Sequence, residues 1–201
     1  MIEVTIFTII FTILVGTISI IIYMIKNYTY DPIFVRRSVI KYDKTKKVSR
    51  TIFNKAINAA ILAPNHFLTE PWRFYYCGKE TKNKIFKLNE SKRKQFESVP
   101  EWLVVTIQTK YNLFDKLHQE EVSACACACQ NFMLSLASDG VGSKWVTGAL
   151  GLNPDSVSKI VNANLTERFI GVIWFGYPEK PLSTIKPPTR TLGLKTLKIL
   201  K

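Results

Sequence analysis

The longest apolar run of the chain is at its N-terminus, where residues 4–25 include no charged side chain. At about 1.5 Å of rise per residue, a helix of this length covers the ~30 Å hydrocarbon core of a bilayer. A cleaved signal peptide is the alternative, but Glu3 stands where such peptides are basic, and no small-residue cleavage site follows. Because Lys26, Arg36 and Arg37 follow the run, the positive-inside rule favours a single-pass membrane anchor with the remaining chain in the cytoplasm.

Beyond the anchor and a short tether at residues 1–30, the pattern predicts one domain at residues 31–201. Apolar positions recur at helical spacing from Ile52 to Ile61, and Pro64 should end that helix. Further helices are expected from Pro32, from Pro154, over the lysine-rich residues 79–98, and in a long segment that runs through residue 139 to Gly140 and Gly142. Strands are expected at residues 72–77, 102–108 and 169–175, which are rich in β-branched and aromatic residues.

The formal charge of +13 and the pI near 9.6 limit the partners that the protein can have. Basic residues concentrate in segments 41–55, 79–94 and 186–201. No nucleic-acid-binding motif accompanies them, so we expect no nucleic-acid partner. An anionic membrane surface, a phosphate-bearing ligand and a simple bias of composition all remain open as explanations.

Three of the four cysteines, Cys125, Cys127 and Cys129, alternate with alanines. On a helix Cys125 and Cys129 share a face and Cys127 points elsewhere, so three thiolates could meet at a metal only on an extended backbone. We therefore interpret them as small residues in close helix packing and predict no metal site.

The segment at residues 63–74, APNHFLTEPWRF, is the least typical of ordinary core. Its two prolines frame a helix-to-strand loop that carries His66, Glu70 and Arg73 among aromatic residues. Upstream, Arg36, Arg37 and Ser38 combine forked donors with a compact hydroxyl, a set that suits a phosphate.

These segments, together with residues 124–150 and 169–180, occur in an order and spacing that resembles the nitroreductase family, flavoproteins that bind FMN at a dimer interface. The resemblance implies an α+β fold with a central mixed, mainly antiparallel sheet flanked by helices, and a homodimer. It implies FMN as cofactor, with NADH or NADPH as electron donor. The chain departs from most relatives at Glu70, where glutamine is usual; a carboxylate there is expected to pair with Arg73.

The resemblance also assigns cofactor contacts. Arg36, Arg37 and Ser38 correspond to the residues that contact the FMN phosphate and ribityl chain. Asn65 and His66 lie in the loop that the family places across the interface, so His66 is expected to reach the cofactor of the neighbouring subunit. The resemblance places Trp145, Val146, Thr147 and Gly148 along the flavin ring. A strand with a buried tryptophan, which contacts no cofactor, is the alternative interpretation of the same residues. Arg190 is either a further phosphate contact or part of a solvated tail.

The flavin would carry the reaction, so no catalytic side chain is assigned. The expected activity is a ping-pong reduction of nitroaromatic, quinone or similar small electron-poor acceptors. A membrane-anchored reductive dehalogenase of the iodotyrosine deiodinase type is one alternative, although no obvious lid insertion is present. The other alternative is a non-catalytic dimer, with or without flavin, that associates with a membrane.

Overall fold

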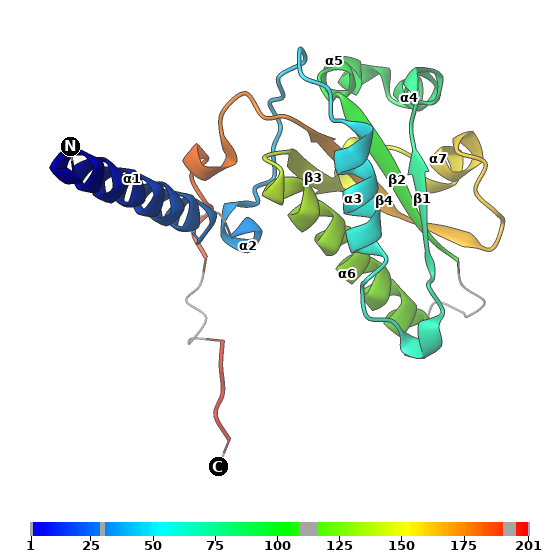
Figure 1. Cartoon of the computed structure of the whole chain (residues 1–201). Coiled ribbons are helices and arrows are strands. Elements are labelled where there is room, and N and C mark those ends of the chain that lie inside the picture. The colour runs from blue at the N-terminus through cyan, green and yellow to red at the C-terminus, as the bar shows by residue number, and fades with distance from the viewer. Residues whose placement is uncertain (1, 29–30, 109–115, 191–195, 201) are drawn as a thin grey trace.

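A four-stranded sheet forms the centre of the domain, and helices cover both of its faces (Figure 1). The computed structural model describes residues 2–28, 31–108, 116–190 and 196–200. The strands are β1 (Trp72–Tyr76), β2 (Glu101–Gln108), β3 (Gly142–Val146) and β4 (Glu167–Gly176), in the spatial order β1-β2-β4-β3. Each neighbouring pair is antiparallel. This is the α+β class with the mainly antiparallel sheet that the sequence predicts.

The two faces of the sheet are filled by two separate hydrophobic clusters. Side chains alternate along a strand, so Leu103 and Val105 of β2 join the cluster beneath α3 (Arg50–Ala60) and α6 (Lys116–Ser138). Trp102 and Val104 point to the opposite cluster. That second cluster lies beneath three shorter helices, α4 (Lys79–Phe86), α5 (Arg93–Glu97) and α7 (Pro154–Ile160). Burial on both faces explains why β2 is a continuous apolar run.

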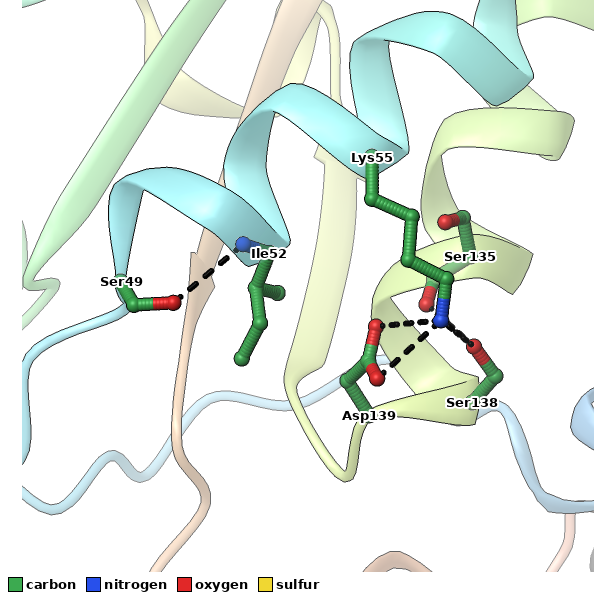
Figure 2. A network of polar contacts seen from close by, with 6 residues as sticks. All are labelled: Ser49, Ile52, Lys55, Ser135, Ser138 and Asp139. Carbon is green, nitrogen blue, oxygen red and sulfur yellow. Dashed lines mark hydrogen bonds and ion pairs between the residues drawn. The ribbon is translucent and has the colours of Figure 1, made fainter.

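Helices α3 and α6 are fastened to each other by polar contacts at one end of the pair (Figure 2). The Ser49 side chain accepts a hydrogen bond from the Ile52 amide and so caps the start of α3. From the next turn of α3, the Lys55 ammonium donates to both carboxylate oxygens of Asp139, at 3.0 and 3.2 Å, and to Ser138 at 3.4 Å. These exposed contacts set the register of the pair more than its stability, since exposed ion pairs contribute little.

Most of the predicted elements are present, but the single helix predicted at residues 79–98 is wrong. The chain forms α4, a 3-10 turn at Glu90–Lys92 and then α5. On one continuous helix Phe86 and Phe96 would lie ~15 Å apart along the axis. In the structure their ring centroids are 5.7 Å apart, and both side chains are buried. Burying both aromatic rings in one cluster therefore requires the break, and the segment is not merely a solvated face.

The first helix, α1 (Ile2–Tyr28), extends away from the sheet (Figure 1). Among the residues that the structure describes, it is the one helix long and apolar enough to cross a membrane. Its most apolar window, Ile6–Tyr23, is not buried against any other part of the chain. Helix α2 (Pro32–Val35) follows it closely in sequence and begins the sheet domain.

A buried carboxylate joins three elements at the start of β4. Glu167 accepts hydrogen bonds from the hydroxyls of Tyr75 on β1 and Thr106 on β2, and from the amide and side chain of Asn164. Burial alone would raise the pKa of Glu167, but the hydrogen bonds from Thr106, Tyr75 and Asn164 outweigh it and hold the pKa below its usual value. Burial and the Glu167 carboxylate raise the pKa of Tyr75 to about 12, so the phenol stays a donor.

We expect Glu167→Gln to lower the free energy of unfolding at neutral pH by about 1–3 kcal/mol, because the hydroxyl donors lose a charged acceptor. Because the pKa of Glu167 is lower in the folded protein, its ionised carboxylate stabilises the fold. This contribution is complete above the unfolded-state pKa of about 4.3, and it is lost as the pH falls through the folded-state pKa. The difference between the two proteins should therefore shrink in acid. Urea unfolding followed by tryptophan fluorescence at neutral pH and near pH ~3 measures it. Glu80→Gln, at an exposed position, is the control, and a difference that did not depend on pH would contradict the assignment.

Candidate functional site

A hollow of about 630 Å³ opens where α2 meets the C-terminal segment of the domain. Its walls carry three arginines and a lysine beside apolar residues. The lining residues are Ile33, Phe34, Arg36, Arg37, Ser38, Ile185, Lys186, Pro187, Pro188 and Arg190. The hollow thus brings the predicted phosphate-binding triplet together with Arg190, which lies more than 150 residues further along the chain.

Local sequence explains why the triplet is presented at this place. Asp31 caps α2 by accepting from the Ile33 amide, and Pro32 occupies its first turn. The helix ends at Arg36, whose ψ of 128° turns the chain into an extended path. Ser38 then forms a parallel bridge with Ser143 of β3, and the Val39 amide donates to the Ser143 carbonyl at 3.0 Å. The triplet therefore runs from a helix end to the edge of the sheet.

Arg37 is occupied by contacts within the chain. Its Nε donates to the carbonyl of Ile185 at 3.2 Å, and its Nη1 donates to the carbonyls of Phe34 and Arg36 at 2.6 and 2.9 Å. These bonds tie the C-terminal segment to α2. Arg37 therefore shapes the hollow through its backbone contacts, although the sequence suggested it as a direct ligand contact.

Arg36 is a half-buried arginine of the hollow whose pKa is lowered. Burial is the largest cause of the lowering of its pKa, and the positive charges of Arg37 and Arg190 lower the pKa further. Among the described residues that line the hollow, none is acidic. A half-buried guanidinium beside two like charges is unfavourable unless an anion joins it. The hollow therefore has the charge and the donor geometry of a site for a multiply charged anion.

The segment predicted to lie along a flavin ring continues from this hollow along β3. Ser143 stands beside Ser38, and Trp145 follows two residues, or ~7 Å, further along the strand. The Trp145 side chain packs against the cluster beneath α3 and α6, whereas Val146 is buried on the opposite face. Because the Val146 side chain is buried, Val146 can contact a ligand only through its backbone. Thr147 and Gly148 are exposed.

Two residues outside the predicted set hold this segment in place. Gly171 of β4 has a φ of 155°, and an added Cβ there would lie 2.9 Å from the Val146 carbonyl oxygen and closer still to the Trp145 indole. The Asn89 side chain donates to the Leu150 carbonyl at 2.9 Å and so braces the 3-10 turn at Gly148–Leu150. A lone asparagine or glycine carries no sequence signal of such a role.

Asn65 and His66 lie far from the hollow. His66 begins a 3-10 turn, His66–Leu68, and its Nδ1 lies 3.6 Å from a carboxylate oxygen of Glu120 near the start of α6. The hollow lies at the other end of that helix, because β3 and its bridge to Ser38 follow directly after Ser138. From Glu120 to Ser138 the helix rises ~27 Å. Figure 1 shows the same separation, with α2 and the loop after α3 at opposite ends of α6.

The loop around His66 is conformationally unusual. Phe67, Leu68 and Glu70 have φ values of 47°, 54° and 43°, and all three are exposed. Non-glycine residues in this region are strained and persist where the surroundings hold them, often at functional sites. The Asn65 carboxamide oxygen accepts from the Glu70 amide at 3.0 Å and closes the loop.

The expected pairing between the Glu70 carboxylate and Arg73 is wrong. The Arg73 guanidinium donates to the backbone carbonyls of Glu70 and Trp72, at 2.9 and 2.7 Å, and to the side chain of Gln108. Positive φ at Glu70 turns its carbonyl toward the guanidinium. The cysteines behave as small packing residues at two positions, since Cys125 and Cys129 are buried on one face of α6 while Cys127 is exposed.

The chain is similar to known proteins in sequence and in fold. The model of the nitroreductase family matches residues 33–119. The Bacillus subtilis protein YfhC, whose name assigns it provisionally as an NAD(P)H nitroreductase, is 29% identical over 167 residues, covering 75% of this chain and 84% of its own length.

Solved structures show the same fold. A nitroreductase-like family protein from Bacillus cereus superposes with a TM-score of 0.72 at 25% identity, over 85% of this chain and 95% of that one. A protein from Exiguobacterium sibiricum, described provisionally as a nitroreductase in complex with FMN, superposes with a TM-score of 0.71 at 16% identity, over 85% and 96% of the two chains. At that identity the second likeness concerns the fold alone. Taken with the family match over residues 33–119 and the Bacillus relatives, these likenesses show that the chain is similar to the nitroreductase family of oxidoreductases in sequence and in fold.

Proposed function

We propose that the protein is an FMN-dependent NAD(P)H oxidoreductase that reduces nitroaromatic, quinone or similar electron-poor acceptors. The observation that carries the proposal is the arginine hollow, in which Arg36 is half-buried beside Arg37 and Arg190 with no acidic residue among the described lining residues. A terminal phosphate monoester carries close to two negative charges at neutral pH, which matches this donor set. The Exiguobacterium relative is described with FMN, and the Bacillus subtilis relative is named for NAD(P)H.

The residues beside the hollow suit the remainder of the cofactor. Arg36 and Arg190 would hold the phosphate, and the Ser38 hydroxyl would bond the polyol chain that leads along β3. The Trp145 ring, the Val146 backbone and the exposed Thr147 and Gly148 would border the ring system. Bound FMN would supply the redox chemistry by accepting a hydride from NAD(P)H and then passing electrons to the acceptor in a ping-pong cycle. Gly171 and Asn89 would keep the bordering segment in position.

The dehalogenase alternative loses support from the fold. Such an enzyme needs an insertion that closes over its substrate, and the basic segment at residues 79–98 does not supply an obvious one. In the structure that segment buries Ile85, Phe86 and Phe96 in the core. It is therefore part of the folded domain and is not free to close over a substrate.

The proposal includes a homodimer. One chain places Arg36 and His66 at opposite ends of α6, too far apart to contact one small ligand. A second copy related by a twofold axis would bring the His66 of one subunit to the hollow of the other. Asn65 would support the same loop, whose strained conformation and exposure fit an interface role.

The proposal also includes the arrangement in the cell. Residues 1–30 would form a single-pass anchor with a short tether, and residues 31–201 would form the cytoplasmic flavin domain. The long apolar α1 and the basic residues that follow it support this orientation.

The first test is an absorbance spectrum of the purified chain supplied with FMN. Flavin bands should stay with the protein through gel filtration, bleach when NADPH or NADH is added without oxygen, and return when a quinone is added. A protein that retained no flavin after reconstitution would contradict the proposal, and one that retained flavin without bleaching would favour a non-catalytic role.

Removal of either phosphate-facing arginine should weaken FMN binding selectively. We expect Arg36→Ala and Arg190→Ala each to raise the dissociation constant by about 10- to 100-fold, the value of one charge-assisted hydrogen bond. Quenching of FMN fluorescence measures the constant. Arg168→Ala, at an exposed position on β4, is the control. Riboflavin, which lacks the phosphate, should bind the wild type and the two variants alike; a loss for both ligands would indicate unfolding.

Mixing variants tests whether the site is shared between subunits. In equal mixtures of Arg36→Ala and His66→Ala chains, random pairing should leave about one site in four intact, so FMN-dependent activity should partly return. Mixtures of Arg36→Ala with Arg190→Ala should recover none, because both residues belong to the same chain's hollow. Equal recovery in the two mixtures, or none in either, would contradict the shared site.

A further inference from the structure

Four exposed lysines lie on one surface of the domain, on the side from which α1 extends. Two chain segments lie together there, residues 33–44 and residues 178–190. They line the arginine hollow jointly, and a second hollow of about 310 Å³ lies between residues 38–41 and residues 178–185. A bridge joins Tyr42 to Pro178, and the Asp43 amide donates to the Tyr177 carbonyl at 2.8 Å. These contacts make the two segments one continuous surface, and Lys41, Lys44, Lys180 and Lys186 are exposed on it.

The charge of this surface, which we call the proximal lysine face, is poorly balanced. The two segments contain Asp43 and Glu179 as their acidic residues. The Asp43 carboxylate is already engaged by Lys46, at 3.4 Å, and by Thr45. The four lysine side chains face solvent, in contrast to Arg37, whose donors are used within the chain.

The position of α1 determines what this face can meet. Helix α1 ends at Tyr28 and α2 begins at Pro32. Four Cα steps reach at most ~15 Å. The domain therefore stays within one to two screening lengths of a bilayer that α1 spans, since the screening length is about 8 Å at physiological salt. In Figure 1 the orange and blue segments of the face lie on the α1 side of the sheet, whereas α4 and α7 lie on the far side.

We propose that the proximal lysine face rests on the anionic head groups of the bilayer that holds α1, and so fixes the orientation of the domain on the membrane. Each lysine near an anionic leaflet gains attraction, and the gain falls off within a screening length. The exposed Ile40 between these lysines adds an apolar side chain that the interface can accept. This inference rests on the proposed membrane anchor and adds a lipid preference to it.

Lysine footprinting of the full chain tests the inference. The chain is reconstituted into nanodiscs of phosphatidylcholine alone, or with about a third of phosphatidylglycerol, and acetylation of each lysine is followed by mass spectrometry. Acetylation of the four proximal lysines should be about fivefold slower in the anionic discs, the factor that corresponds to the attraction of one lysine to such a leaflet. Lys84, Lys87 and Lys159, exposed on and beside α4 and α7, are the controls and should change little. Salt at about 0.5 M should remove the difference.

Charge-reversal variants and added inorganic phosphate test whether the protection comes from lipid. The double variant Lys180→Glu with Lys186→Glu should abolish the protection of Lys41 and Lys44, whereas Lys84→Glu with Lys159→Glu should leave it. Equal acetylation rates of the four proximal lysines in the two kinds of disc would overturn the inference. It would also be overturned if inorganic phosphate, added to neutral discs, slowed the acetylation of Lys186 and anionic lipid slowed that of no other lysine. If the chain failed to remain with neutral discs in high salt, the anchor itself would be wrong. That outcome is distinguishable from a chain that stays anchored without lipid-dependent protection.

Discussion

The whole arrangement depends on a small antiparallel sheet that must be covered on both faces. The buried apolar side chains on β2 and β4 point into one of two hydrophobic clusters, and neither cluster could remain exposed to water. The long pair α3 and α6 covers one face, and three short helices cover the other. This division explains why the chain breaks the basic segment into two helices, because Phe86 and Phe96 must both reach the second cluster. It also leaves one end of the sheet to be closed by α2 and the C-terminal segment, where the hollow forms.

Two charged groups in the structure show the difference between a structural role and a binding role. The Glu167 carboxylate is buried, but Tyr75, Thr106 and Asn164 supply donors to it, so the charge is compensated within the fold. The Arg36 guanidinium is half-buried beside two more arginines, and none of the described residues that line the hollow is acidic. The first arrangement fastens β1, β2 and β4 together. The second arrangement would be stabilised by a bound anion, and for that reason we assign a binding function to it.

The proposed homodimer follows from a distance within one chain. The strained loop at Asn65 and His66 and the arginine hollow are separated by most of the length of α6. The loop at His66 is exposed and the hollow is open to solvent, and each contains groups that suit contact with another molecule. A twofold pairing of chains would satisfy both at once and would generate two equivalent sites. The proposed anchor and the proximal lysine face would then place such a dimer close to lipid.

The sequence alone determined the features that depend on neighbouring residues. Local signals in the sequence include the helical spacing before Pro64, the β-branched runs, the prolines at the first helical positions 32 and 154, and the apolar N-terminal run. The elements that they predict are present. The order of the motifs indicated the family that the comparisons with known proteins then matched. Tertiary structure decided what depends on residues distant in the chain. It brought Arg190 to Arg36, engaged Arg37 with the Ile185 carbonyl, turned the Glu70 carbonyl instead of its carboxylate toward Arg73, and placed Asn89 and Gly171 behind the Trp145–Gly148 segment. Periodicity reports which face of an element is buried, but a partner in space is set by how several elements pack, and a single sequence carries no signal of that contact.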